Sequence, residues 1–134
     1  MRAVLDPNVL IAALLSPAGA PAALVLGWFR GRFELVVSEQ LLQELSRALA
    51  YPKLRARVSK PDAAAFAQLL RSTARVAPDP AVAPSRSRAR GDDYLLALAQ
   101  STAAILVPGD LDVLALAGQL PVMSPVDFLK QIGV

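Results

Sequence analysis

Near its N-terminus the chain reads Ala3-Val4-Leu5-Asp6-Pro7-Asn8-Val9-Leu10-Ile11. The apolar run before Asp6 predicts a short strand that is buried on both faces, as strands of parallel sheets are. Pro7 suits the first turn of a helix, where its missing N–H is not needed. The stretch therefore places an acid at the carboxyl end of a buried strand, which is where open α/β sheets bind their ligands.

Strand and helix patterns alternate along the rest of the chain. Apolar runs predict further strands at 34–37, 104–107 and 119–123, and a brief edge strand at 75–77. Helices are expected over 9–15, 21–30, 39–50, 53–58, 62–73, 92–100 and 125–132, with another opening at 110. Residues 78–91 have the composition of a surface loop. This alternation predicts a parallel sheet with helices on both faces, and 134 residues indicate a single domain, 1–134.

The chain contains neither Cys nor His. Their absence excludes disulfides, thiolate metal sites and the Ser-His and Cys-His mechanisms. Any chemistry must therefore use carboxylates, hydroxyls, Lys, Arg or Tyr. A hydrophobic content of 54% suggests in addition a face that a partner covers.

Residues 9–29 carry no charge, so a membrane span and a signal peptide both have to be weighed. Pro17 and its neighbours divide this segment into pieces too short to span a bilayer. The polar Asp6-Pro7-Asn8 junction lies where the apolar core of a signal peptide should begin. We therefore expect a folded segment, no membrane partner and a cytoplasmic protein.

Four acids follow predicted strands or open predicted helices: Asp6, Glu44, Asp93 and Asp110. Asp6 and Asp110 become neighbours if their strands are adjacent, because parallel strands end at the same edge. Several carboxylates cannot stay ionised together without a cation, and oxygen-only ligands favour Mg²⁺ or Mn²⁺. Such a site activates a water and stabilises charge at a phosphodiester without histidine.

A simpler interpretation is that these acids stabilise helices. Asp92, Asp93, Asp110 and Asp112 fall in first turns, where carboxylates cap free N–H groups and meet the positive end of the helix dipole. Glu44 can be a solvated residue at the edge of its helix. Asp6 fits this interpretation least, because its flanks are apolar.

With these residues identified, the chain resembles a PIN domain of the VapC-like toxin branch. The matching blocks occur in the order of the family and cover 5–9, 38–45, 51–54, 91–99, 109–112 and 124–129. The first block contains the D-x-N of Asp6 and Asn8, and the second contains Glu44. In the third block Asp93 matches the family acid better than Asp92, by its offset from Leu96-Ala97.

The resemblance implies a Rossmann-like parallel sheet in a three-layer α/β/α sandwich and RNA cleavage that depends on Mg²⁺ or Mn²⁺. It assigns metal binding and catalysis to Asp6, Glu44, Asp93 and Asp110. Asp112 becomes an auxiliary metal ligand, and Asn8 and Asp92 become supporting residues. A homodimer is also implied, and often an antitoxin protein whose tail inhibits the site.

Two departures from the family pattern motivate an alternative. Pro108 stands where the family usually has Thr or Ser, and Arg88-Ala89-Arg90-Gly91 replaces a stretch that is commonly acidic. The alternative is a catalytically weak PIN-like module that binds RNA or a protein. A phosphate-accepting receiver-type domain is a third reading, but the Lys expected after the fourth strand is absent.

The charge balance favours a nucleic-acid partner. Setting the four principal acids aside from the 11 Asp+Glu leaves seven against 14 Lys+Arg. The basic residues nearest the predicted site are Arg86, Arg88, Arg90, Lys53 and Arg55, and we expect them to contact RNA phosphates. A simple preference for Arg at the surface explains the same count without RNA.

Overall fold

The computed structural model describes residues 1–81, 93–109 and 121–133. In chain order the elements are β1 (Arg2–Leu5), α1 (Pro7–Leu15), α2 (Ala20–Phe29), β2 (Glu34–Val37), α3 (Glu39–Leu49), α4 (Pro52–Arg55), α5 (Lys60–Thr73), β3 (Arg75–Val76), α6 (Asp93–Ser101), β4 (Ile105–Val107) and α8 (Pro125–Gln131). The predicted alternation of strands and helices is confirmed across these ranges. Residues 82–91 of the loop predicted at 78–91 and the helix expected from 110 lie outside the described residues.

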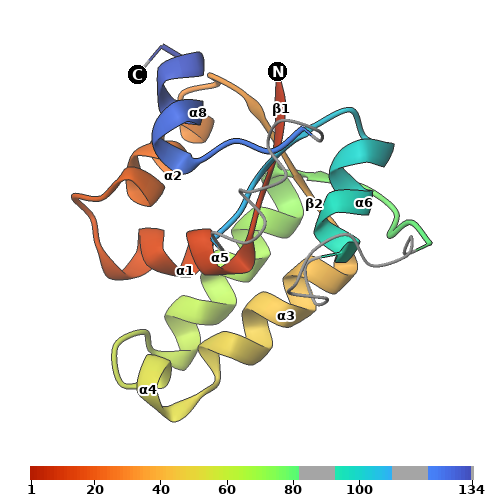
Figure 1. The fold of residues 1–134 in the computed structure, drawn as a ribbon. Coiled ribbons are helices and arrows are strands. Elements are labelled where there is room, and N and C mark those ends of the chain that lie inside the picture. Colours follow the sequence, from red (N-terminus) through yellow and green to blue (C-terminus); the bar gives the residue numbers. More distant parts are fainter. Residues whose placement is uncertain (82–92, 110–120, 134) are drawn as a thin grey trace.

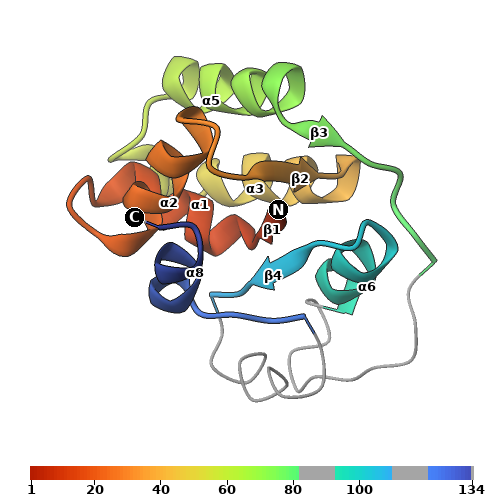
Figure 2. The same cartoon turned by 90° about the horizontal axis from the view of Figure 1, so that it is seen from above.

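The four strands form one parallel sheet in the order β3-β2-β1-β4 (Figure 2). Ala3 of β1 is paired with Leu35 of β2 on one side and with Ile105 of β4 on the other. On the other side of β4, Leu106 of this strand forms a single parallel bridge with Val122. The strand predicted at 119–123 is thus reduced to one bridge within the part of the chain that is described.

Helices cover the sheet on both sides (Figure 1). In that view β1 runs from the N-terminus down to the start of α1, with α6 on one side of it and α2 and α8 on the other. Helix α6 packs on β1 and β4, α1 packs on α2 and α3, and α8 packs on α2. The α/β fold class and its layered arrangement are therefore confirmed.

The core lies between the sheet and these helices. Val4, Leu5 and Leu35 are fully buried, as expected of strands covered on both faces. The predicted apolar stripe of α3 also faces inward, and Leu41 and Leu45 have no exposed surface. Glu44 lies half-buried at the edge of this stripe, in the position that the spacing of 100° per residue predicts.

Local sequence signals set the helix ends. The hydroxyls of Ser38, Ser59 and Ser124 each accept an N–H from the first turn of the following helix. Gly31 follows α2 with φ of +74°, a left-handed conformation that glycine adopts without strain. Because Ser59 is a cap, α5 begins at Lys60, two residues before the predicted start.

An ion pair connects α3 to α5. Both guanidinium Nη atoms of Arg71 donate to the carboxylate of Glu39, at 2.6 and 2.9 Å. These hydrogen bonds lower the pKa of Glu39 and raise that of Arg71. Both side chains are about half exposed, so solvent screens the pair.

The described ranges contain no single helix that is long and apolar enough to cross a membrane. Helices α1 and α2 reach the required length only as a pair, and they meet at a bend of 99°.

Phe128 gives a test of how α8 is held. Its fully buried ring packs edge-on against Phe33, with ring centroids 5.1 Å apart. We expect Phe128→Ala to lower the free energy of unfolding by about 3–5 kcal/mol, because a buried aromatic ring is replaced by a cavity. Urea denaturation monitored by circular dichroism measures this loss. Val126→Ala, on the same helix but 53% exposed, is the control, and an equal loss in the two variants contradicts the packing described.

Candidate active site

Asp6 lies at the junction of β1 and α1 and is only 2% exposed. Its backbone N–H continues the sheet by donating to Val107. Its side chain caps α1, because Oδ1 accepts the N–H of Asn8 at 2.8 Å. The helix-capping interpretation, which the sequence favoured least for Asp6, therefore does apply to it. The other oxygen, Oδ2, accepts the N–H of Gly109 at 3.2 Å. Two backbone donors from different parts of the chain thus compensate the burial of this carboxylate.

Gly109 approaches the Asp6 carboxylate closely because it has no side chain. A Cβ built at this position would lie 3.0 Å from Cβ of Asn8 and 3.7 Å from Oδ2 of Asp6. A larger residue would push the turn after β4 away from Asp6. The sequence analysis did not assign this role, although a glycine in the turn that follows a strand can signal a close backbone approach.

Glu44 is positioned by α3 and held from α6. The hydroxyl of Tyr94 donates to Oε2 of Glu44 at 2.8 Å. Tyr94 itself is only 3% exposed, and it follows Asp93, the first residue of α6. The hydrogen bond therefore brings the start of α6 against the middle of α3. Tyr94 was also missed from the sequence, although a buried tyrosine usually requires a partner for its hydroxyl.

The predicted site residues are described to different extents. Asp6 and Glu44 are described in full, and Asn8 is exposed in the first turn of α1. Asp93 is described by its backbone alone. Lys53 and Arg55 lie on α4, beyond the C-terminal end of α3. The predicted residues outside the described ranges are Asp92, Asp110, Asp112, Arg86, Arg88 and Arg90.

Chain connectivity relates two of the remaining acids to this pair. Asp110 directly follows Gly109, whose N–H contacts Asp6, and Asp93 directly precedes Tyr94, whose hydroxyl contacts Glu44. Within the described residues no group of three or more acids forms a metal cluster. Next to Asn8 and Gly109 is a hollow of about 300 Å³, which buried Pro108 also lines.

Comparisons with known proteins agree with this fold. A family model described as "PIN domain" matches residues 2–112, so the chain belongs to the PIN-domain family. A solved structure titled "Crystal Structure of PAE2754 from Pyrobaculum aerophilum" matches with a TM-score of 0.66 and 22% identity, over 98% of this chain and 95% of that one. At this identity the likeness shows the fold alone. No curated protein matches the chain.

PIN domains are generally nucleases and typically use divalent metals. The donors present here suit such an ion, since Asp6 and Glu44 offer only oxygen. Backbone N–H groups hold the carboxylate of Asp6, and the hydroxyl of Tyr94 holds that of Glu44, so both oxygen donors are fixed in place. The chemistry of this donor set fits Mg²⁺ or Mn²⁺.

The Tyr94–Glu44 hydrogen bond can be tested through stability. Tyr94→Phe removes the hydroxyl and leaves Oε2 of Glu44 without this donor. We expect the free energy of unfolding to fall by about 1 kcal/mol, measured by urea denaturation. Tyr51→Phe is the matched control, because the other tyrosine is 61% exposed and its substitution should change nothing. A Tyr94 variant as stable as the control would show that this contact contributes little.

Proposed function

We propose that the chain is a divalent-metal-dependent endoribonuclease, and that it is the VapC-like toxin of a type II toxin-antitoxin pair. The observation that carries the nuclease proposal is the buried carboxylate of Asp6, fixed by N–H groups from Asn8 and Gly109 at the carboxyl end of β1. In parallel sheets, this end is where ligands bind. The resemblance to VapC-like toxins in sequence motivates the toxin role.

In this proposal, Asp6, Glu44, Asp93 and Asp110 hold the cation, with Asp112 as an auxiliary ligand. A divalent ion at these acids supplies positive charge that offsets the charge developing on the phosphodiester and favours deprotonation of an attacking water. The chain contributes fixed geometry. The backbone N–H groups orient Asp6, and the hydroxyl of Tyr94 orients Glu44, so neither carboxylate has to reorganise when the substrate binds.

RNA is the proposed substrate because the surface outside the acids is basic. Arg86, Arg88 and Arg90 precede the acid at 93 in sequence, and they are proposed to hold phosphates of the bound strand. Lys53 and Arg55 on α4 are proposed to do so as well. None of the described Lys and Arg residues of α4 is in an ion pair, so both charges are available to a phosphate.

The nuclease proposal predicts the effect of neutralising single acids. Asp6→Asn and Glu44→Gln should each reduce Mn²⁺-dependent cleavage of a mixed RNA pool by about 100-fold or more, since even residues that only support a metal ligand are worth 10–100-fold. Mn²⁺ affinity, measured by titration calorimetry, should fall in parallel. Asp127→Asn, in the exposed first turn of α8, removes the same charge and should leave both quantities unchanged.

Two outcomes would contradict the assignment. Unchanged cleavage in Asp6→Asn would exclude Asp6 from the reaction. RNA binding without cleavage by the unaltered protein, over a range of RNAs and metals, would favour the alternative of a binding module. Buried Pro108 supports that alternative, because it lies beside Gly109 at a position where the family usually has the hydroxyl of Thr or Ser.

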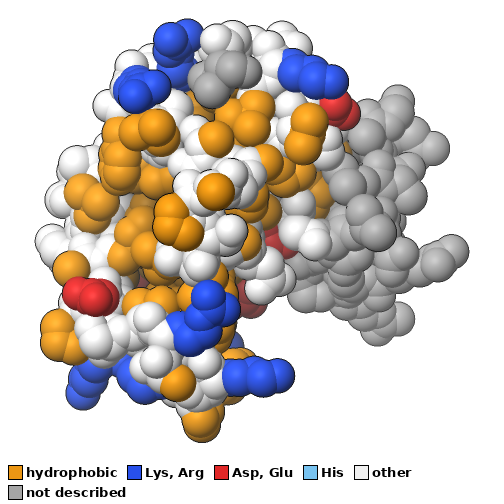
Figure 3. Space-filling view, turned by 90° about the vertical axis from the view of Figure 1, so that its left-hand side faces the viewer, with side chains coloured by type: hydrophobic (Ala, Val, Ile, Leu, Met, Phe, Trp, Pro, Cys, Tyr) orange, Lys and Arg blue, Asp and Glu red, His pale blue; other side chains and the backbone are white. Residues whose placement is uncertain are grey.

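A second copy of the chain is the partner that we propose for the α1–α2 face. Figure 3 shows hydrophobic side chains gathered on this side of the molecule. A hollow of about 400 Å³ there is almost entirely apolar and is lined by residues of α1, α2 and α5. Leu26 and Phe29 on α2 are 46% and 55% exposed. Exposed apolar patches of this kind mark interaction sites, and a homodimer would cover them.

The dimer proposal predicts a change of mass in solution. Phe29→Ser should shift the protein from dimer to monomer in light scattering coupled to gel filtration, because it removes an exposed aromatic ring from the patch. Val126→Ser changes an equally exposed apolar residue of α8 and should leave the dimer intact. A monomeric unaltered protein would reject the second copy and leave this face to an antitoxin.

A further inference from the structure

A small notch lies where α3, α4 and α5 meet. It has a volume of about 160 Å³ and is lined by Ser46 of α3, Arg55 of α4, and Lys60, Ala63 and Ala64 of α5. Two basic residues and a serine thus contribute to one small hollow whose lining is otherwise mostly apolar. A hydroxyl and two cations are groups that bind phosphate oxygens.

The guanidinium of Arg55 is the unusual feature of this notch. Its Nη1 atom is buried, yet it has no hydrogen-bond partner among the described residues. Arg55 and Lys60 also take part in no ion pair with any residue that the structure describes. Buried polar groups are nearly always hydrogen-bonded, so Arg55 carries an unused cationic donor, which reaches an anion in the notch only if its side chain turns toward the hollow.

The notch is separate from the candidate active site. Glu44 is bound by Tyr94 and therefore faces α6, whereas Ser46 lines a hollow shared with α5. Two residues correspond to about 200° around a helix, so Glu44 and Ser46 lie on opposite flanks of α3. An anion in the notch is consequently not the phosphate that the acids would act on.

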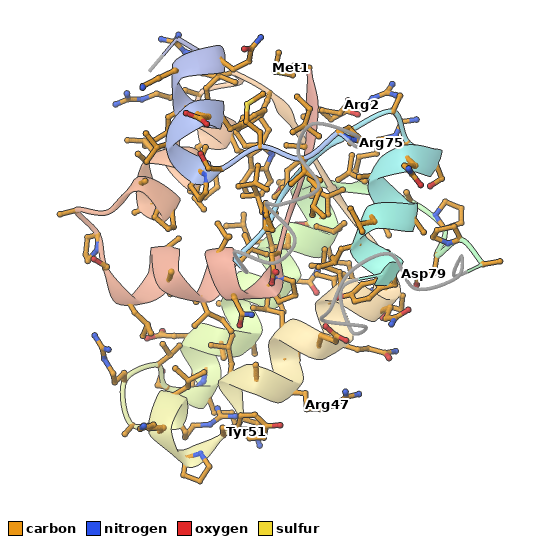
Figure 4. All side chains as sticks on the ribbon, in the orientation of Figure 1. Met1, Arg2, Arg47, Tyr51, Arg75 and Asp79 are labelled. Carbon is orange, nitrogen blue, oxygen red and sulfur yellow. The ribbon has the colours of Figure 1, made fainter. Side chains whose placement is uncertain are left out.

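Between these flanks, the outer surface of α3 offers a path for a polyanion. Arg47 lies three residues from Glu44, about 60° around the helix on the solvent side, and it is exposed. Tyr51 follows the C-terminal end of α3 and is 61% exposed. Figure 4 shows Arg47 and Tyr51 together at this end of the molecule, next to α4. Cations that follow a backbone and aromatic rings that stack on bases are the features of single-strand binding.

We propose that the notch of Ser46, Arg55 and Lys60 binds a backbone phosphate of single-stranded RNA, remote from the bond that is cut. The strand passes from the acids over Arg47 and Tyr51 and places one of its distal phosphates in the notch. The identity of this ligand as RNA rests on the proposed nuclease function. The notch therefore contributes to the affinity for long RNA and leaves the chemistry at the acids unchanged.

The first experiment measures inorganic phosphate binding by NMR titration. Arg55→Met keeps the aliphatic stem, which preserves its packing, and Lys60→Met provides an independent variant should Arg55→Met unfold. Each should weaken phosphate binding at least fivefold. Arg30→Met is the charge-matched control, because exposed Arg30 lies between α2 and β2, at the opposite end of the strands from α3. Phosphate binding that is equally tight in Arg55→Met and Arg30→Met overturns the site.

The second experiment compares RNA lengths in the presence of Asp6→Asn, which prevents cleavage in the proposed mechanism. Single-strand sites cover about 4–16 nucleotides, so oligonucleotides of about 4 and about 16 nucleotides serve as probes. Arg55→Met should weaken the longer RNA about tenfold, reduce its salt slope by about 1 and leave the shorter RNA unchanged. A loss of phosphate binding with no effect on either RNA overturns the RNA assignment and indicates free phosphate as the ligand.

The two experiments separate this inference from the nuclease proposal. If Asp6→Asn does not change cleavage, the proposed active site is wrong, but a length-dependent effect of Arg55→Met still supports the notch. If Asp6→Asn abolishes cleavage and Arg55→Met has no effect on long RNA, the nuclease proposal stands and the notch is rejected.

Discussion

The carboxylate of Asp6 connects three parts of the chain. Asp6 directly follows β1. Its carboxylate caps α1 by accepting the N–H of Asn8, and it holds the turn after β4 by accepting the N–H of Gly109. This carboxylate is buried, and without these hydrogen-bond donors its burial would lower the stability of the fold. The same two hydrogen bonds that compensate the burial of the carboxylate also fix its orientation. Stability and the proposed chemistry therefore depend on one set of contacts, so substitutions near Asp6 should rarely affect only one of them.

The fold could be predicted from the sequence because its determinants are local. Buried strand residues such as 35–37 form an uninterrupted apolar run, and Ser38 and Gly31 mark helix ends by side-chain and backbone chemistry that acts within a few residues. The prediction differs from the structure where contacts between distant parts of the chain determine the length of a strand. In the described part of the predicted strand at 119–123, pairing with β4 is limited to one bridge, between Leu106 and Val122.

The candidate site was predictable only in part, for a related reason. Asp6 and Glu44 could be selected from strand ends and helix edges. The contacts of Gly109 and Tyr94 could not, because each joins residues 50 or more positions apart. Likewise, Arg55 was recognised as a cation near Glu44 in sequence, but its place on the other flank of α3 follows from how α4 packs. The periodicity of apolar residues predicts which face of a helix is buried. It does not predict which other element packs against that helix.

The shortness of β3 has a consequence for how the protein associates. This outermost strand contains only Arg75 and Val76, and Arg75 is held by Glu34 of the adjacent strand. Long unpaired edges invite another chain to add a strand, and that route leads to aggregation. Strand β3 is too short to pair with an added strand over any length, and the charged side chain of Arg75 belongs to it. At this edge of the sheet, the addition of a strand from another chain is therefore disfavoured.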